Sequence, residues 1–281
     1  MLRIAAFVAL AKAILAVEPA CPIVFDGRVP STASLTDFDT NNGGDWMPFN
    51  PDYIRAEAVP WSESLLLPTV DTSSRFDTET VPLEVTISDE SIFMDQNGFR
   101  RAGLQFLEDS NEGSPANTGQ KSIHFSIRLD PERPLNRSHE YLLVWHETAA
   151  YDANQFNFEA GTIIGQEGLG GDTYKLLDRN YQVLWETPIL DDAWQNFAIT
   201  VDWEADTLQM WYSEGDAELE QATEPIDNDN GGEGQYQIGI LKKPMGTDDV
   251  VNSGFQESGI DEGLIYGGIF IEDSADDCVS L

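Results

Sequence analysis

The sequence predicts an all-β protein, a jelly-roll β-sandwich that forms a single domain after a signal peptide. From residue 81 onward, apolar and polar residues alternate with a period of two, which is typical of half-buried strands. Turn-forming Gly and Asn residues separate these runs, for example at 97–98, 167–171 and 230–232. No long helical periodicity and no internal repeat accompany them, which favours a two-sheet sandwich.

Each predicted strand places apolar side chains on one face and polar side chains on the other. In segment 122–129, Phe125 and its apolar neighbours alternate with His124 and Arg128. A face rich in His, Arg and amide side chains suits sugar hydroxyls, which need paired donors and acceptors. The predicted strands are 82–87, 122–129, 140–146, 155–160, 196–203, 207–213, 235–241 and 264–272.

The first twenty residues have the pattern of a secretory signal peptide. A basic start precedes an apolar run over residues 4–17, with small residues near position 20. A membrane anchor is the alternative, but the run is too short and Lys12 interrupts it. We therefore expect a secreted, extracellular protein with residues 1–20 as leader and 21–281 as one domain.

Residues 21–80 show little periodicity and many Pro, Ser and Asp residues, so we expect loops that wrap the sandwich. Four aromatic residues of this segment are candidate anchors or cleft walls: Trp46, Phe49, Tyr53 and Trp61.

The two cysteines, Cys21 and Cys278, lie at opposite ends of the predicted domain. In an oxidising compartment we expect one disulfide between them, and two free thiols are the alternative. No Cys and His residues have zinc-ligand spacing. The sequence therefore predicts neither a metal nor another cofactor.

The chain is strongly acidic, with 50 Asp and Glu residues against 15 Lys and Arg residues and a formal net charge of −35. Nucleic acid is excluded as a partner, because binding it needs clustered basic residues. The same repulsion argues against anionic polysaccharides and favours a neutral substrate. We also expect no membrane partner and a monomer.

Segment 133–159 carries the densest polar chemistry of the chain. Glycoside hydrolysis needs two carboxyl groups, and Glu140 and Glu159 are the candidates. Strict alternation places His146 on the face of Glu140 and Glu147 on the other face, unless a bulge intervenes. His146 is the third candidate catalytic residue. The candidate substrate-binding residues are Arg100, His124, Arg128, Gln155, Asn157 and Gln237.

Six segments in chain order resemble one known family, glycoside hydrolase family 131. They are G-F-R-R-A-G-L (98–104), R-P-L-N-R-S-H-E-Y (133–141), N-Q-F-N-F-E-A-G-T-I (154–163), W-Q-N-F-A-I-T-V-D (194–202), G-Q-Y-Q-I-G-I-L-K-K-P (234–244) and I-Y-G-G-I-F-I-E-D-S (265–274). The resemblance implies a β-jelly roll, secretion from a fungus and action on β-1,3-, β-1,6- or β-1,4-linked glucans.

The resemblance also implies catalytic positions. The acid of the H-E-Y motif is Glu140, whereas the acid expected after the paired arginines is replaced by Gly103. The histidine expected in the G-Q-Y segment is replaced by Gln237. The leading hypothesis is a β-glucan hydrolase that uses carboxyl groups in a concave cleft.

Two alternatives stay open: a catalytically impaired β-glucan-binding protein and a polysaccharide lyase. The sequon at 136–138 makes Asn136 a candidate glycosylation site.

Overall fold

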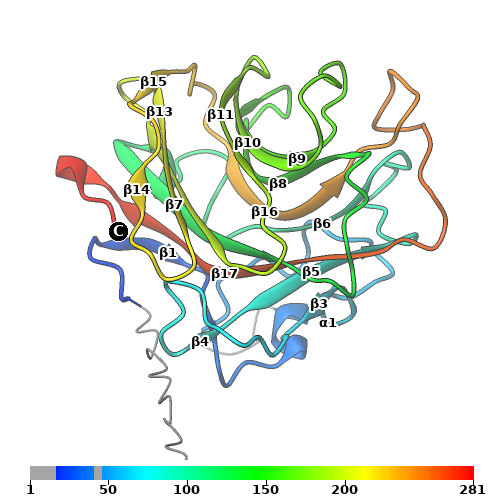
Figure 1. The fold of residues 1–281 in the computed structure, drawn as a ribbon, viewed down its shortest axis with the longest axis horizontal. Helices are drawn as coiled ribbons and strands as arrows, with labels where there is room; N and C mark the ends of the chain where they lie inside the picture. The colour runs from blue at the N-terminus through cyan, green and yellow to red at the C-terminus, as the bar shows by residue number, and fades with distance from the viewer. Residues whose placement is uncertain (1–16, 41–45) are drawn as a thin grey trace, which may run out of the picture.

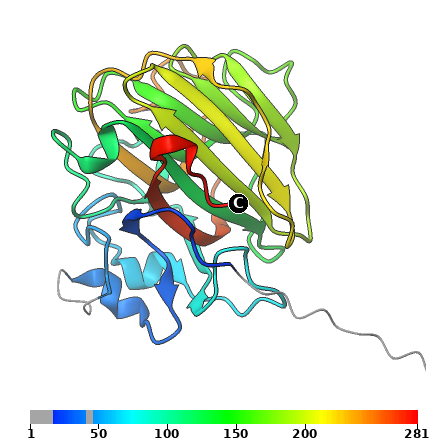
Figure 2. The same ribbon diagram turned by 90° about the vertical axis from the view of Figure 1, so that its left-hand side faces the viewer.

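Two antiparallel sheets packed face to face form the protein (Figures 1 and 2). The computed structural model describes residues 17–40 and 46–281, so nearly all of the predicted leader lies outside the described residues. The larger sheet has nine strands. Its strands are, in spatial order, β14 (Glu220–Gln221), β13 (Thr207–Glu214), β12 (Gln195–Asp202), β7 (Gln120–Leu129), β17 (Asp261–Asp273), β5 (Leu83–Ser88) and β3 (Leu65–Leu66), with β1 (Ile23–Asp26) paired to β17 and β15 (Ile226–Asp227) paired to β13.

The smaller sheet has six strands and carries the candidate site on its outer face. In spatial order they are β11 (Val183–Pro188), β10 (Thr173–Asp178), β9 (Asn154–Gly161), β8 (Glu140–Glu147), β16 (Gln235–Lys242) and β6 (Arg100–Leu104). Because β8 lies between β9 and β16, its side chains occupy the middle of this sheet (Figure 1).

Aromatic side chains from both sheets meet in the core between them. Phe125 of β7 and Phe197 of β12 belong to the larger sheet, and Phe158 of β9 belongs to the smaller one. The ring centroid of Phe158 lies 5.0 Å from that of Phe125 and 4.7 Å from that of Phe197. All three side chains are buried, so the predicted apolar faces form one shared core. The jelly-roll β-sandwich is confirmed.

Most of the segment before residue 81 lies in the lower part of both views, while its strands β1 and β3 pair with the larger sheet (Figures 1 and 2). It contains more regular structure than predicted, since it forms short strands and turns of helix. Phe49 and Trp61 are buried anchors, and Tyr53 is about half exposed at the cleft described below. The elements not yet named are β2 (Val29–Pro30), β4 (Thr80–Val81), α1 (Trp61–Ser64) and the 3₁₀ turns η1 (Leu35–Asp39), η2 (Pro115–Asn117) and η3 (Ala275–Asp277).

The predicted strands are all present, with boundaries within three residues of those expected. Among strands of five or more residues, the sequence analysis missed β6, β10 and β11. In β10, Leu176 faces the core and Leu177 faces the other way, so apolar residues on both faces obscure the alternation. No helix among the described residues is long and apolar enough to cross a membrane.

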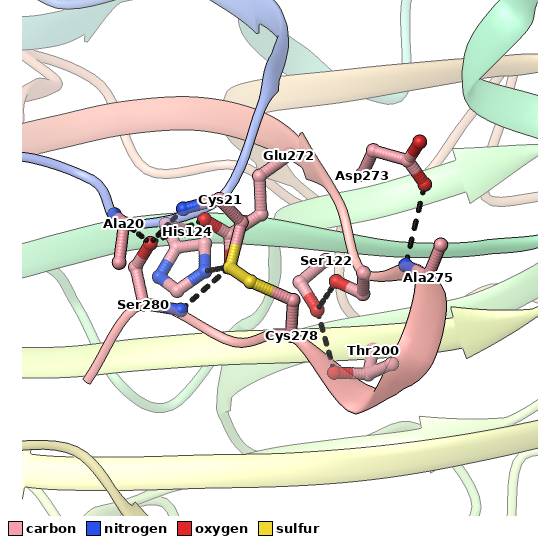
Figure 3. Close-up of a disulfide and its surroundings, with 11 residues drawn as sticks. Ala20, Cys21, Ser122, His124, Thr200, Glu272, Asp273, Ala275, Cys278 and Ser280 are labelled. Atoms are coloured by element: carbon pink, nitrogen blue, oxygen red, sulfur yellow. Dashed lines mark hydrogen bonds and ion pairs between the residues drawn. A yellow bond between two sulfur atoms is a disulfide. The ribbon is translucent and has the colours of Figure 1, made fainter.

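A disulfide joins Cys21 to Cys278, as predicted, and ties the two ends of the domain together (Figure 3). Ser280 reinforces this closure, because its Oγ accepts hydrogen bonds from the backbone N–H groups of Ala20 and Cys21. The same hydroxyl donates to the buried carboxylate of Glu272, which also pairs with His124.

Replacing both cysteines, Cys21→Ser with Cys278→Ser, is expected to lower the free energy of unfolding by about 2–5 kcal/mol. The bridge closes a loop with a sequence separation of 257 residues, so its loss frees the unfolded chain. Denaturant titration of the double variant measures the loss. Because the chain has no other cysteine, the parent protein with and without reductant is an internal control, and equal midpoints would contradict the expectation.

Candidate active site

A β-bulge in β8 decides which side chains face outward from the smaller sheet. The pairing of β8 with β9 shifts register between Leu142 and Val144. Both Leu143 and Val144 pack into the core between the sheets. One extra residue on the inner face reverses the alternation beyond it, so Glu140 and Glu147 lie on the same outer face. The prediction that Glu147 faces away from Glu140 is therefore wrong.

The outer face of the smaller sheet forms the floor of a cleft of about 860 Å³. Trp145 and Glu147 of β8, Gln235 of β16 and Arg101 of β6 line this floor. Loop residues and the start of β9 supply the walls, among them aromatic and amide side chains. The wall residues with such side chains are Asn50, Tyr53, Phe93, Gln96, Phe99, Gln105, Tyr151, Asn154 and Tyr181.

Three side chains from three neighbouring strands join across the cleft floor. The Nη2 of Arg101 donates to the Oε1 of Gln237 at 2.8 Å, and the Nε2 of Gln237 donates to the Oε2 of Glu147. The guanidinium of Arg101 also lies over the ring of Trp145, with its Cζ 5.7 Å from a ring centroid. These contacts fix the position of the Glu147 carboxyl group at the cleft surface.

Burial changes the proton affinity of both charged groups on this floor. Burial raises the pKa of Glu147, against the opposing effects of Arg101 and of the hydrogen bond from Gln237. Burial also lowers the pKa of Arg101 to about 10, and this arginine stays charged at neutral pH. A carboxyl group with a raised pKa beside a substrate-sized cleft has the properties of a general acid.

Asp152 is the second carboxyl group at the cleft. It lies in the exposed turn between β8 and β9, and its Oδ1 accepts a hydrogen bond from the Thr148 hydroxyl at 2.9 Å. Among the described residues, Glu147 and Asp152 are the only acidic side chains that line the cleft.

The predicted acid pair, Glu140 and Glu159, is brought together at the opposite end of β8. Glu140 is buried, and its two oxygens bind the Lys243 ammonium group and the backbone N–H of Ile164. Glu159 is fully buried, and within residues 17–40 and 46–281 neither of its carboxyl oxygens has a hydrogen-bond donor. Lys243 lines the cleft and covers the pair, so neither carboxyl group lines the cleft itself.

The environment of this pair raises the pKa values of both Glu159 and Lys243. Burial raises the pKa of Glu159 to about 8, and the neighbouring Glu140 contributes further. Burial lowers the pKa of Lys243, but Glu140 and Glu159 outweigh it and raise the value. At neutral pH, Glu159 therefore holds a proton while Lys243 stays charged.

Neither predicted histidine faces the cleft. His146 is fully buried on the core side of β8, because the bulge turned it inward, and its ring nitrogens contact Gln155 and Asn117. Burial lowers the pKa of His146 to about 4, so it is neutral at neutral pH. His124 is buried in the larger sheet against Phe270, 4.4 Å between ring centroids, and does not line the cleft.

The other predicted substrate-binding residues divide between the two sheets. Arg128 belongs to β7 of the larger sheet, where it pairs with Asp71, away from the cleft. Of the paired arginines, Arg101 lines the cleft, and Arg100 instead donates to the backbone carbonyls of Asn97 and Phe99.

The predicted amide residues also differ in their positions. Asn157 lies opposite Trp145 in the strand pairing and therefore shares the cleft face. Gln155 instead binds His146 and the backbone carbonyls of Gly231 and Glu233. The predicted glycosylation site, Asn136, is exposed, and its side chain donates to Glu257.

A family model described as the glycoside hydrolase 131 catalytic N-terminal domain matches residues 23–277. The chain belongs to glycoside hydrolase family 131. Among solved structures, the chain is similar to the catalytic domain of a family 131 β-glucanase from Podospora anserina. The TM-score is 0.69 and the sequence identity is 21%, over 89% of this chain and 96% of that one.

A second similar structure is the catalytic domain of the family 131 protein from Coprinopsis cinerea. Its TM-score is 0.71 and its identity 19%, over 92% of this chain and 98% of that one. A comparison with curated proteins gave no match. The two structures confirm the fold, and the family is one of glycoside hydrolases.

The positions at which this family member departs from the expected pattern lie next to Glu147. A Cβ atom added to Gly103 would lie 3.9 Å from the Oε1 of Gln237, whose amide nitrogen contacts Glu147. Glu140 lies seven positions away along β8, about 20 Å at the usual rise per residue. The two departures therefore meet at Gln237, the side chain that contacts Glu147.

The sequence analysis did not select Glu147, Asp152 or Lys243. Glu147 was assigned to the wrong face of its strand. Asp152 and Lys243 lie outside the periodic part of the strands. Position did give a signal: Glu147 and Asp152 lie within the polar segment 133–159, and Lys243 lies within the family-like segment 234–244.

Proposed function

We propose that this chain is a secreted hydrolase that cleaves neutral β-glucans in the cleft of the smaller sheet. The observation that carries this proposal is Glu147, a carboxyl group with a raised pKa that lines a cleft of about 860 Å³. Membership of a glycoside hydrolase family supports the reaction type. The net charge of −35 favours a neutral substrate, and the Cys21–Cys278 disulfide fits an extracellular location.

Glu147 is the proposed general acid. It donates a proton to the glycosidic oxygen as the bond to the anomeric carbon breaks. Asp152, which is exposed at the same cleft, is the proposed base that removes a proton from the attacking water. Gln237 holds the Glu147 carboxyl in place, which limits its rotation before proton transfer.

The walls of the cleft supply the groups that recognise a glucan. Amide side chains such as Gln96 and Asn154 offer both donors and acceptors to sugar hydroxyls. Tyr53 and Tyr151, both exposed, present aromatic rings to the apolar faces of glucose units.

Glu140 and Glu159 stay the alternative acid pair. They are adjacent, and Glu159 holds a proton at neutral pH, as a general acid must. Access to them requires that Lys243 leave Glu140. Replacing single carboxyl groups by amides distinguishes the Glu147–Asp152 pair from the Glu140–Glu159 pair, as described in the Discussion.

Purified protein is expected to release reducing sugar from at least one neutral β-glucan. A panel of β-1,3-, β-1,6- and β-1,4-linked glucans and a polyuronate measures both activity and linkage preference. No sugar release from any neutral glucan would contradict the proposal, and unsaturated products from the polyuronate would indicate a lyase instead.

A β-glucan-binding protein with little turnover is the second candidate. Gly103 favours it, because no carboxyl group extends from that position toward Glu147. Retarded migration in a gel that contains β-glucan, without sugar release in the panel, would identify this function.

A further inference from the structure

Arg101 is a buried cation that has no carboxylate partner among the described residues, although the chain has 50 acidic residues. Its side chain is 5% exposed. Its two hydrogen bonds go to amide oxygens, those of Gln96 at 3.0 Å and Gln237 at 2.8 Å. Within residues 17–40 and 46–281 its Nε has no acceptor, and no carboxylate lies within ion-pair distance. A buried charge of this kind is costly unless a ligand completes its contacts.

Gly103 leaves space beside this cation. A Cβ atom at this position would meet only Trp145, at 3.7 Å, and the Oε1 of Gln237, at 3.9 Å, both ordinary contact distances. That oxygen is the one to which Arg101 donates. A small group from a ligand in the cleft can therefore reach the surroundings of the guanidinium without moving the backbone.

The surroundings strengthen the attraction of this guanidinium for an anion. The Cζ of Arg101 lies 5.6 Å from the ring centroid of Phe93 and 5.7 Å from that of Trp145. These rings exclude water from the two sides that they cover, and charge-assisted hydrogen bonds are stronger in such an environment. The Glu147 carboxyl, which Gln237 links to Arg101, carries no charge while it acts as proton donor.

We propose that Arg101, Gln237 and the space over Gly103 form a subsite for a single carboxylate. The planar guanidinium matches a carboxylate better than it matches a neutral hydroxyl. The carboxylate comes from an acid-terminated glucan, in which one sugar unit is oxidised, or from a small free acid such as formate. The binding of an oxidised sugar rests on the proposed function, whereas the binding of formate does not.

The net charge does not oppose this subsite. Charges separated by more than about 8 Å are largely screened at physiological ionic strength. The binding energy of a single carboxylate therefore comes mainly from its direct contact with Arg101. A polyuronate carries many carboxylates along the acidic surface and is still repelled.

Calorimetric titration with three probes tests the proposal. The probes are a neutral β-glucan tetrasaccharide, the same tetrasaccharide ending in gluconic acid, and sodium formate. Sodium chloride at the same ionic strength is the control for formate. The acid-terminated sugar is expected to bind at least about 10-fold more tightly than the neutral one. Preference for the oxidised sugar identifies a sugar carboxylate, and binding of formate alone identifies a free acid. Equal affinities for the two sugars, within twofold, together with no formate binding overturn the proposal.

Three variants locate the subsite. Arg101→Gln is expected to lose the preference, and Arg100→Gln, the matched control, is expected to keep it because Arg100 does not line the cleft. Gly103→Glu places a carboxyl group of the chain itself in the space over residue 103, and it is also expected to lose the preference for the acid-terminated sugar. This variant tests the proposal even if Arg101→Gln does not fold.

A preference retained by Arg101→Gln or by Gly103→Glu would overturn the proposal. The neutral tetrasaccharide separates this proposal from the proposed function. If both sugars bind equally and formate does not bind, only the subsite fails. If formate binds and the sugars do not, only the glucan site fails.

Discussion

Glu147→Gln is expected to lower kcat on a neutral β-glucan by about 10³-fold, the range typical of a lost general acid. The amide keeps the shape of the side chain and still accepts the hydrogen bond from Gln237, but it has no proton to give to the leaving oxygen. KM is expected to change little, because the contacts to the substrate remain. Initial rates of reducing-sugar release, measured over a range of substrate concentrations, provide both constants.

The pH dependence of the same variant adds an independent test. In the parent protein, activity is expected to fall as the pH rises through the raised pKa of Glu147, because the acid form is then lost. The residual activity of Glu147→Gln should lack this decline.

Glu140→Gln is the matched comparison, since it changes the acid covered by Lys243 and not the acid in the cleft. It is expected to keep more than about a tenth of the parent kcat, whereas Asp152→Asn is expected to lose about 10²-fold. The reverse outcome, loss in Glu140→Gln with activity retained in Glu147→Gln, would assign the chemistry to the Glu140–Glu159 pair.

The sequence was sufficient for the architecture because the strands of this sandwich alternate clearly. Phe125 and Phe197 lie on the predicted apolar faces, and the two rings meet with centroids 5.3 Å apart. The Cys21–Cys278 pairing was equally accessible, because a chain with two cysteines allows one intramolecular disulfide.

The site was harder to predict because one extra residue in β8 reverses which of the following side chains face the cleft. Leu143 and Val144 are both apolar, and nothing in their types marks which one is the extra residue. The bulge became visible only through the partners of β8, with a second register shift between Ile238 and Leu241 of β16. His146 and Glu147 exchanged faces as a result, and with them the expected catalytic groups.

Long-range contacts account for the remaining differences. Glu140 and Glu159 were expected in an open cleft, but Lys243, 103 positions after Glu140 in the sequence, covers them. Such a contact depends on the pairing of β8 with β16, which periodicity within one segment does not specify.

The second large effect concerns stability. Glu159→Gln is expected to raise the free energy of unfolding at pH 9 by several kcal/mol relative to the parent protein. In the parent, the folded-state pKa of Glu159 is about 8, against the ordinary glutamate value of 4.5 in the unfolded chain. The neutral amide removes this difference because it does not titrate.

The sign of the effect follows from which state binds the proton. Below pH 4.5 Glu159 is protonated in both states, so the parent and Glu159→Gln are expected to differ little there. Between pH 4.5 and 8 the unfolded chain releases the proton that the folded protein retains, and the parent loses about 1.4 kcal/mol per pH unit relative to the variant. Denaturant titrations from pH 4 to 9 measure this slope, with Glu204→Gln on an exposed turn as control. A difference between parent and Glu159→Gln that is constant across this range would show that Glu159 does not hold a proton in the folded protein.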